Sequence, residues 1–298
     1  MKKTVIFTKL KNIYMKLTFL LFTGLVFSII ALSSCKKDKT AEDTTEIETT
    51  FELSAYQGMA ENLTQDAQEV LNEAAVTNNF SGSGFVAGID GTTGILSCAT
   101  VTVTPLIGFP KNILIDFGIV GCTSPNGVTR RGKINVTLTD SLRRPGSVAT
   151  MNFDNYFVGI YKKEGTITWT NTSTAAQKSW NRTCVNGKIT NTLNSNFWLH
   201  SGTQNIAQTA GSATPLILLD DVFSITGNRT VTNAAGKTRV GTILTALQKK
   251  TICDNIDKGT YQIQGPNHIA VIDFGNGTCD NQATISIDGH TPRPFTLR

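Results

Sequence analysis

The triplet Asp-Phe-Gly is the first feature that suggests chemistry, because it occurs twice within closely similar stretches. Residues 113–122 read ILIDFGIVGC, and residues 270–279 read AVIDFGNGTC. In protein kinases this triplet binds magnesium, but a kinase also needs a glycine-rich loop, a strand lysine and a His-Arg-Asp loop. None of these is recognisable in the sequence. The repeat therefore predicts repeated architecture, with Asp116 and Asp273 bonded to turn amides or paired with a basic neighbour.

Hydrolysis is the alternative chemistry, and it would depend on aspartates. A glycosidase needs two placed carboxylates, yet residues 80–298 hold a single glutamate, Glu164. No spacing singles out a pair among the candidates Asp116, Asp154, Asp220, Asp221 and Asp273. No GxSxG nucleophile elbow is present, and no metal-binding spacing joins the histidines His200, His268 and His290.

Two loops contain oxygen ligands of the kind that hard cations prefer, residues 254–259 and 273–281. Neither fits an EF-hand, and runs of Asp, Asn and Gly are ordinary turn sequences. We therefore expect no metal and no cofactor.

Aromatic side chains could form a platform for a carbohydrate. Strand alternation places Trp169 beside Ile167 on an apolar face, which predicts a core position. Trp180 lies between basic residues in QKSWNRT and is the best candidate for an exposed ligand contact.

Both Asp-Phe-Gly stretches end in a cysteine, and each has a second cysteine at a matching distance upstream. Cys98 and Cys122 lie 12 residues before and after Pro110. Residues equidistant from the tip of a hairpin face each other, so this unit predicts a hairpin with a disulfide across its open end.

The second unit repeats the pattern, since Cys253 and Cys279 lie 13 residues before and after Pro266. An exported protein meets oxidising conditions, which permit disulfides. We expect Cys98–Cys122 and Cys253–Cys279 bridges, each contributing roughly 3 to 3.5 kcal/mol, and Cys184 as a buried free thiol.

The start of the chain resembles a bacterial lipoprotein signal. Five lysines precede an apolar run over residues 17–32, which has secretory length and is short for a membrane span. The run ends in LSSC, which resembles a lipobox, so we expect a signal peptide over 1–34 and acylation of Cys35, with palmitate-type chains. Translation starts at either Met1 or Met15.

The partner of an acylated Cys35 is the lipid bilayer, because more than one acyl chain gives stable anchoring. The polar residues 35–52 predict a disordered tether. Their charges resemble the export tag of surface lipoproteins, which favours an outer-membrane location in the cell envelope, on either face.

The charge is unevenly distributed along the mature chain. Residues 35–79 carry ten acidic and three basic residues, a net charge of −7, whereas residues 80–298 carry +7. The acidic segment either packs against the basic body or is solvated separately, and the sequence favours separate solvation. The whole-chain charge of +5 comes from the signal, so nucleic acid is not an expected partner.

Residue patterning predicts one helix followed by a long β region. Apolar residues recur every three or four positions over 53–78, with acids on the other faces. From residue 80 the period becomes two, with frequent turn signals and no helical pattern between strands. We expect a mainly β fold, an antiparallel meander of about a dozen strands over 80–298, closed as a sandwich or curled as an open barrel.

Several stretches resemble a group of uncharacterised β-rich lipoproteins of Bacteroidota. They are CATVTV with GFPKNILIDFGIVGC, NGVTRRGKINVTLT, GSVATMNFDNYFVGIYKKEGTITWTNT and IDFGNGTCDNQATISIDG. The resemblance spans most of the mature chain and implies the location and the fold, but no activity.

The functional hypothesis is therefore an envelope lipoprotein that acts as a non-catalytic binding or structural module, with a glycan or a protein as its possible partner. The alternative is a hydrolase of envelope or host polysaccharide. A carboxylate pair about 5 to 9.5 Å apart in a cleft would favour the enzyme.

Overall fold

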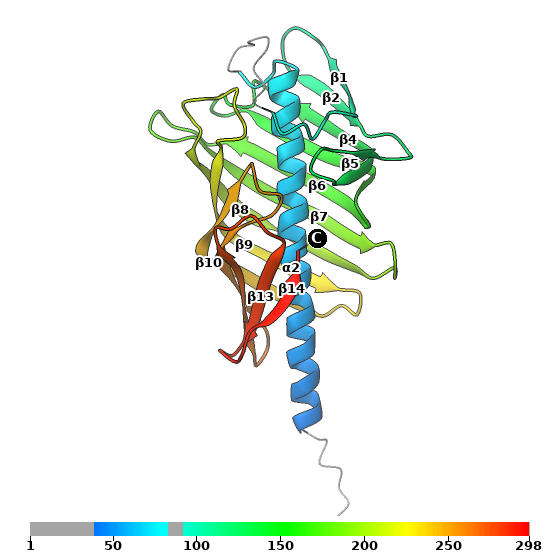
Figure 1. The fold of residues 1–298 in the computed structure, drawn as a ribbon, viewed down its shortest axis with the longest axis vertical. Coiled ribbons are helices and arrows are strands. Elements are labelled where there is room, and N and C mark those ends of the chain that lie inside the picture. Colours follow the sequence, from blue (N-terminus) through cyan, green and yellow to red (C-terminus); the bar gives the residue numbers. More distant parts are fainter. Residues whose placement is uncertain (1–38, 83–91, 298) are drawn as a thin grey trace, which may run out of the picture. The chain divides into compact units, whose positions relative to one another are not determined.

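The computed structural model describes residues 39–82 and 92–297. The chain divides into two compact units, Met1–Thr45 and Glu46–Arg298. In the first unit the described residues, 39–45, are helical. The second unit contains the remainder of the helix and the whole sheet (Figure 1). The predicted signal peptide and Cys35 lie outside the described residues.

The helix α2 spans Lys39–Thr77, so the predicted tether is wrong for residues 39–52. Tertiary contacts explain the helix from Glu46 onward, because Glu46 accepts hydrogen bonds from Asn267 and Glu48 pairs with Arg293. Its end agrees with the prediction: Asn79 has a φ of 56°, and the amide of Phe80 donates to the carbonyl of Ala75. No helix of the described part of the chain is long and apolar enough to cross a membrane.

Fourteen antiparallel strands form one sheet in the second unit, which confirms the predicted mainly β meander. Apart from the short β3, which pairs with β4, each strand pairs with the next along the chain. The strands are β1 (Thr100–Thr104), β2 (Lys111–Asp116), β3 (Cys122–Thr123), β4 (Thr129–Leu138), β5 (Val148–Val158), β6 (Tyr161–Asn171), β7 (Ser179–Asn191), β8 (Phe197–Ala210), β9 (Val222–Asn233), β10 (Thr238–Lys250), β11 (Lys258–Gln264), β12 (Ile269–Asn276), β13 (Gln282–Ile287) and β14 (Arg293–Thr296).

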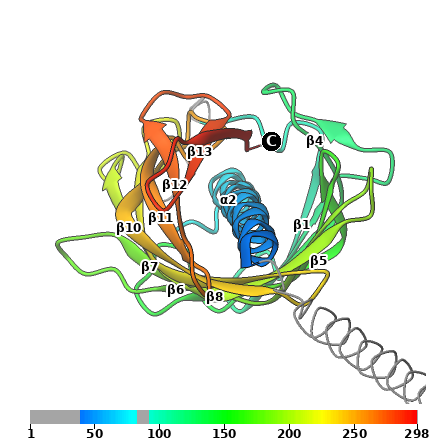
Figure 2. The same cartoon turned by 90° about the horizontal axis from the view of Figure 1, so that it is seen from below.

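The sheet curls around α2 and stays open, as Figure 2 shows from below. The two ends of its strand order are β1 and β14, and no pairing joins them among the described strands. Of the two predicted arrangements, the structure therefore has the curled open sheet. The inward faces follow the predicted alternation, with Ile134, Val136 and Leu138 all buried on β4.

The helix takes the place that a second sheet would have in a sandwich. Its apolar stripe packs against the inner face of the sheet, and every residue from Gln57 to Gln68 is buried. The members of the stripe are Leu53, Met59, Leu63, Ala67, Val70, Leu71 and Ala74. Because the stretch from Gln57 to Gln68 is buried on every side, its polar residues must also find partners inside the protein.

Two loops meet over α2 between the sheet edges. Asn126, before β4, donates a 2.6 Å hydrogen bond to Asp254, before β11. In the same loop as Asp254, the amide of Ile256 donates to the Asn62 side chain of the helix at 2.8 Å. Each loop follows a disulfide cysteine, Cys122 or Cys253, so the contact joins the two related hairpins across the opening of the sheet.

Candidate functional site

The repeated Asp-Phe-Gly triplets share one local hydrogen bond, at the end of β2 and inside β12. The Asp116 carboxylate accepts a hydrogen bond from the amide of Gly118 at 2.8 Å, and Asp273 accepts one from Gly275 at 2.9 Å. Both glycines have positive φ, 73° and 97°, which favours glycine at this position. The phenylalanine between is buried in each copy. The triplet thus ends β2 and lies at a register shift within β12, where Asp273 and Asn276 both pair with β11. The Lys133 ammonium 3.2 Å from Asp116 adds a basic neighbour to the first copy.

Disulfides join Cys98 to Cys122 and Cys253 to Cys279, the two predicted pairs, with Cα separations of 5.6 and 5.0 Å. Cys184 is free and buried.

The register of the first hairpin differs from the prediction. Thr104 pairs with Asn112, which centres the turn on Gly108 rather than Pro110. If this register continued, Cys98 would face Gly118. The chain turns after Asp116, and the residues of that turn bring Cys122, instead of Gly118, next to Cys98.

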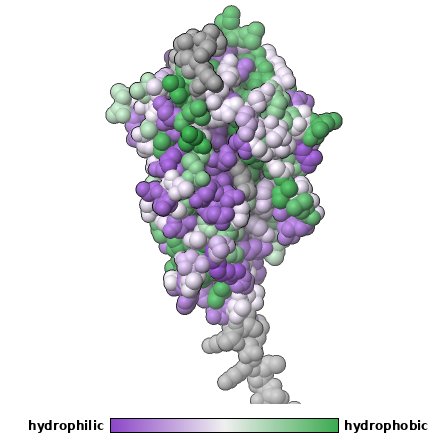
Figure 3. All heavy atoms as spheres, viewed as in Figure 1, coloured by the Kyte–Doolittle hydropathy of each residue, from purple (hydrophilic) through white to green (hydrophobic). Residues whose placement is uncertain are grey.

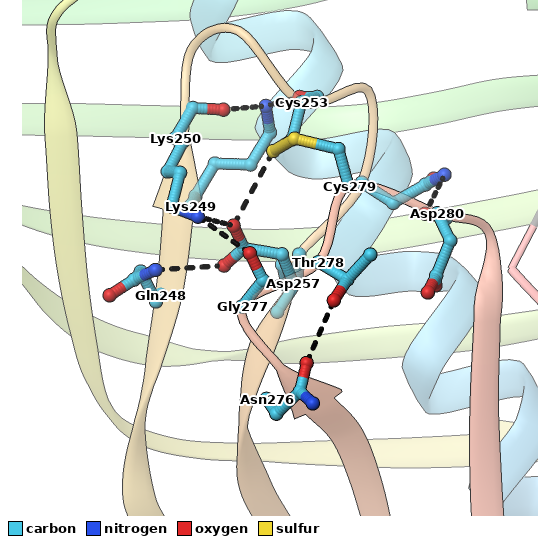
Figure 4. Close-up of a disulfide and its surroundings, with 12 residues drawn as sticks. Gln248, Lys249, Lys250, Cys253, Asp257, Asn276, Gly277, Thr278, Cys279 and Asp280 are labelled. Atoms are coloured by element: carbon cyan, nitrogen blue, oxygen red, sulfur yellow. Dashed lines mark hydrogen bonds and ion pairs between the residues drawn. A yellow bond between two sulfur atoms is a disulfide. The ribbon is translucent and has the colours of Figure 1, made fainter.

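The second disulfide has a buried carboxylate beside it (Figure 4). Asp257 Oδ2 lies 3.4 Å from Cys253 Sγ and 3.1 Å from the Lys250 ammonium, and the Gln248 amide donates to Oδ1 at 3.2 Å. Asp257 and the two bridged cysteines are the one group of three potential metal ligands within the described residues. Sulfurs joined in a disulfide are not thiolate ligands. We therefore interpret this group as a structural crosslink between the loops before β11 and after β12.

A group of buried titratable residues lies between α2 and the sheet. Glu61, on the helix, has one carboxylate oxygen 2.8 Å from Arg229 Nε and the other 3.3 Å from Arg182 Nη2. The Gln204 amide donates to Glu61 at 2.8 Å, and its oxygen accepts from both arginines. All four side chains are buried. One buried carboxylate thus faces two buried guanidinium groups.

Three further groups extend this buried cluster. Arg229 Nη1 lies 3.2 Å from His200 Nδ1, and Cys184 Sγ lies 3.6 Å from the same nitrogen. Arginine only donates, so Nδ1 is an acceptor and His200 carries its proton on Nε2. Burial, with nearby cations, lowers the pKa of His200 well below its usual value, which keeps the ring neutral. Burial likewise lowers the pKa of Lys163 to about 8.

More ion pairs connect the helix to the sheet along its length. Arg130 donates to Asp66 from Nε at 3.0 Å and from Nη2 at 2.5 Å, and Lys249 pairs with Glu69. The acidic helix therefore packs against the basic body. The prediction of two separately solvated surfaces is wrong, because the helix acids Glu61, Asp66 and Glu73 are buried.

A small cavity lies where the C-terminal half of α2 meets the loops before β5 and β9. Trp169 and Trp180 form its apolar wall with Leu71, Leu142, Pro215, Leu218 and Phe223. Trp180 is 8% exposed, so the prediction that it is an exposed residue is wrong, although it does line this cavity. The free volume is about 30 Å³, which suits one or two waters rather than a sugar ring.

Asp221 and Arg143 are the charged groups of this cavity. The Gln208 amide connects them: it donates to Asp221 at 2.7 Å and accepts from Arg143 at 3.1 Å. Burial raises the pKa of Asp221 to about 7, and neighbouring Asp220 adds to the rise, while Arg143 and the Gln208 bond oppose it. Asp221 is therefore partly protonated at neutral pH.

No family model, curated protein or solved structure matches this chain.

The five aspartates considered for hydrolysis form no group of three within the described residues. Asp116 on β2 and Asp154 on β5 flank Lys133 of the strand between them, β4. Asp273 lies within β12 and bonds the amide of Gly275. Asp220 accepts a hydrogen bond from Thr214 within its own loop at 2.6 Å. No three of these carboxylates lie close enough to share an ion in the described part of the chain.

The histidines do not form one group, since His268 and His290 lie near Asp288 and His200 lies elsewhere. His268 bonds Asp288 at 2.6 Å on the surface, His290 is exposed, and His200 is buried in the cluster around Glu61.

Sequence reasoning missed the buried cluster, although strand parity carried a signal for it. Trp180, Arg182 and Cys184 alternate along β7 and all point inward. An inward cysteine and tryptophan therefore place Arg182 inside as well. A buried arginine requires an acid partner, and the acidic helix supplies it.

Proposed function

We propose that this chain is an acyl-anchored lipoprotein of the outer membrane that acts as a non-catalytic binding or structural module. The anchor is supported by the basic and apolar leader that ends in LSSC at residues 32–35. The module is supported by the chemistry of the second unit, in which ionisable groups serve to hold a helix inside a sheet.

One observation carries the non-catalytic part of the proposal. The inward acid, base and thiol groups closest to each other, Glu61, Lys163, His200 and Cys184, are all at most 2% exposed. Catalysis needs such groups within reach of a substrate, and here protein atoms surround them. The space inside the curl is occupied by α2, so any ligand binds the outer surface or the loops.

The anchor is tested by Cys35→Ala in the full chain in cells. Acyl labelling should disappear and an unprocessed precursor should accumulate, whereas Cys184→Ala, at the buried free thiol, should label normally. Normal processing and membrane retention of Cys35→Ala would contradict the anchor.

Binding is tested with the full mature chain, displayed on glycan arrays and used in crosslinking pull-downs from envelope fractions. The proposal expects capture of a glycan or protein without turnover in a screen of polysaccharides, peptides and esters. Turnover that co-purifies with the protein through every purification step would contradict the proposal.

Asp221 favours a second candidate, a polysaccharide hydrolase. A carboxylic acid with a pKa of about 7, beside two tryptophans, has the protonation behaviour of a general acid. The cavity lacks a second carboxylate among its lining residues, and that argues against this function. Loss of a measured turnover in Asp221→Asn, with an unchanged circular dichroism spectrum, would establish the enzyme.

A further inference from the structure

The loop between β1 and β2 presents large apolar side chains to solvent. We call residues 105–110 the apolar tip. Leu106 is 84% exposed, Ile107 is 92% exposed and Phe109 is 37% exposed. Figure 3 shows hydrophobic side chains at the top of this face, at the end of the sheet where Figure 1 places β1 and β2. Three such residues in a six-residue loop are more than the scattered exposure of an ordinary surface.

The apolar tip is held in place by a lysine beneath it. The Lys111 ammonium donates to the carbonyls of Pro105 at 2.8 Å and Leu106 at 2.9 Å, and it lies 5.1 Å from the centre of the Phe109 ring. Lys111 is 4% exposed, so this contact is internal to the hairpin. The apolar side chains are therefore displayed by a defined loop, and displaying them needs no ordering step on binding.

We propose that the apolar tip inserts into the interfacial region of a lipid bilayer. The backbone at its apex is suited to an apolar medium, since Lys111 satisfies two carbonyls and the prolines at 105 and 110 have no amide hydrogen. No acidic residue lies between Thr104 and Ile115, so nothing in the tip repels anionic headgroups.

A bilayer fits this surface better than a protein does. The tip is a single hairpin turn, whereas a stable protein interface buries about 800 Å² on each partner. A bilayer accepts two or three side chains at a convex point, and each buried CH₂ contributes to binding. The inference rests on the proposed function only for bringing the chain to a membrane, through Cys35.

The test places an environment-sensitive NBD fluorophore on Ile107→Cys in the full chain. The control is Leu193→Cys, because Leu193 is another 77% exposed leucine, in the loop between β7 and β8. Vesicles contain phosphatidylethanolamine and phosphatidylglycerol, with or without doxyl-labelled lipid. The protein is purified in its acylated form, so the Cys35 thiol carries lipid, and the four cysteines of the two disulfides have no free thiol. Native Cys184 is buried and stays unlabelled in the folded protein.

The expected result is a blue shift and doxyl quenching at position 107, with neither at position 193. Leu106→Cys is the second labelled variant and should behave like position 107. NBD emission reports only on the environment of the labelled residue, so it tests the apolar tip separately from the anchor. A failure of acyl labelling at Cys35 would overturn the anchor alone. Aqueous emission at both 106 and 107 with vesicles present, in protein with an intact circular dichroism spectrum, overturns the membrane-inserting tip.

Discussion

Replacing Glu61 by glutamine is expected to destabilise the protein more than any change at an exposed acid of the same helix. Glu61 is the one carboxylate that contacts both Arg182 and Arg229, at 3.3 and 2.8 Å. Glutamine keeps the shape and can still accept one hydrogen bond. It removes the negative charge, and the two guanidinium groups then face each other in a buried space.

The magnitude follows from burial. Removing one partner of a buried ion pair costs about 3–5 kcal/mol, because the remaining charge is left uncompensated. Lys163 increases this cost, since its ammonium belongs to the same positive cluster. For a domain of this size the loss corresponds to a melting temperature roughly 6–20 °C lower.

The matched control is Glu48→Gln. Glu48 lies on the same helix and pairs with Arg293 at 2.8 Å, but its side chain is 58% exposed. An exposed pair contributes about 0–1 kcal/mol, so this change should be close to neutral.

The assay is equilibrium unfolding in urea of the mature chain with both disulfides intact, followed by circular dichroism. A double-mutant cycle with Arg229→Gln measures the coupling between the two side chains. If Glu61→Gln and Glu48→Gln lower the free energy of unfolding equally, the buried cluster does not hold the helix in the sheet, and the reasoning is refuted.

Three further predictions concern pH and the disulfides. Lys163 has a pKa lowered to about 8 in the folded state, so its charge opposes folding fully below pH 8 and not at all above pH 10.5. Lys163→Met should therefore raise the free energy of unfolding by about 3 kcal/mol at pH 7, and urea titrations should show the gain vanishing near pH 10.5. Asp221 has a raised pKa, so its penalty is full above pH 7 and absent below pH 4. Asp221→Asn should gain about 2 kcal/mol at pH 8, after allowance for partial solvent screening, and nothing at pH 4; equal gains at both pH values would contradict this. Replacing Cys98 and Cys122 together by serine should cost about 3 kcal/mol, and non-reducing peptide mapping of the unmodified chain should recover the Cys98–Cys122 linkage, with no bridge to Cys184.

The strands were predictable from sequence because each has one dry and one wet face. Ile134, Val136 and Leu138 alternate with polar residues, and the structure buries those three. The disulfides were predictable because turns and cysteines are local features, even though the exact register was not. The turn after Asp116 changes which residues face each other across the hairpin. Irregularities of this kind leave little trace in the hydrophobic pattern of a sequence.

The start of the helix and the buried acids were not predictable by the same reasoning. Polar residues over 39–52 indicate a tether when they are read locally, whereas contacts such as Glu48–Arg293 come from residues about 245 positions away. Glu61 and Asp66 likewise lie on helix faces that would be solvated if one side of the helix faced water. The burial of those faces depends on the curl of the sheet around the helix, which the local sequence pattern does not predict.

The buried acids of the helix and the inward cations of the sheet depend on each other for charge compensation. The sheet carries inward cations at Arg130, Lys163, Arg182, Arg229 and Lys249, all at most 1% exposed. Without α2 these cations would line an open groove, where water would solvate them and the strands would lose their apolar partner. The helix supplies both requirements at once, an apolar stripe for the sheet and carboxylates for its cations. An external ligand would have to replace both to enter the curl, and we therefore expect recognition to occur on the outer surface and at the loops, where the apolar tip lies.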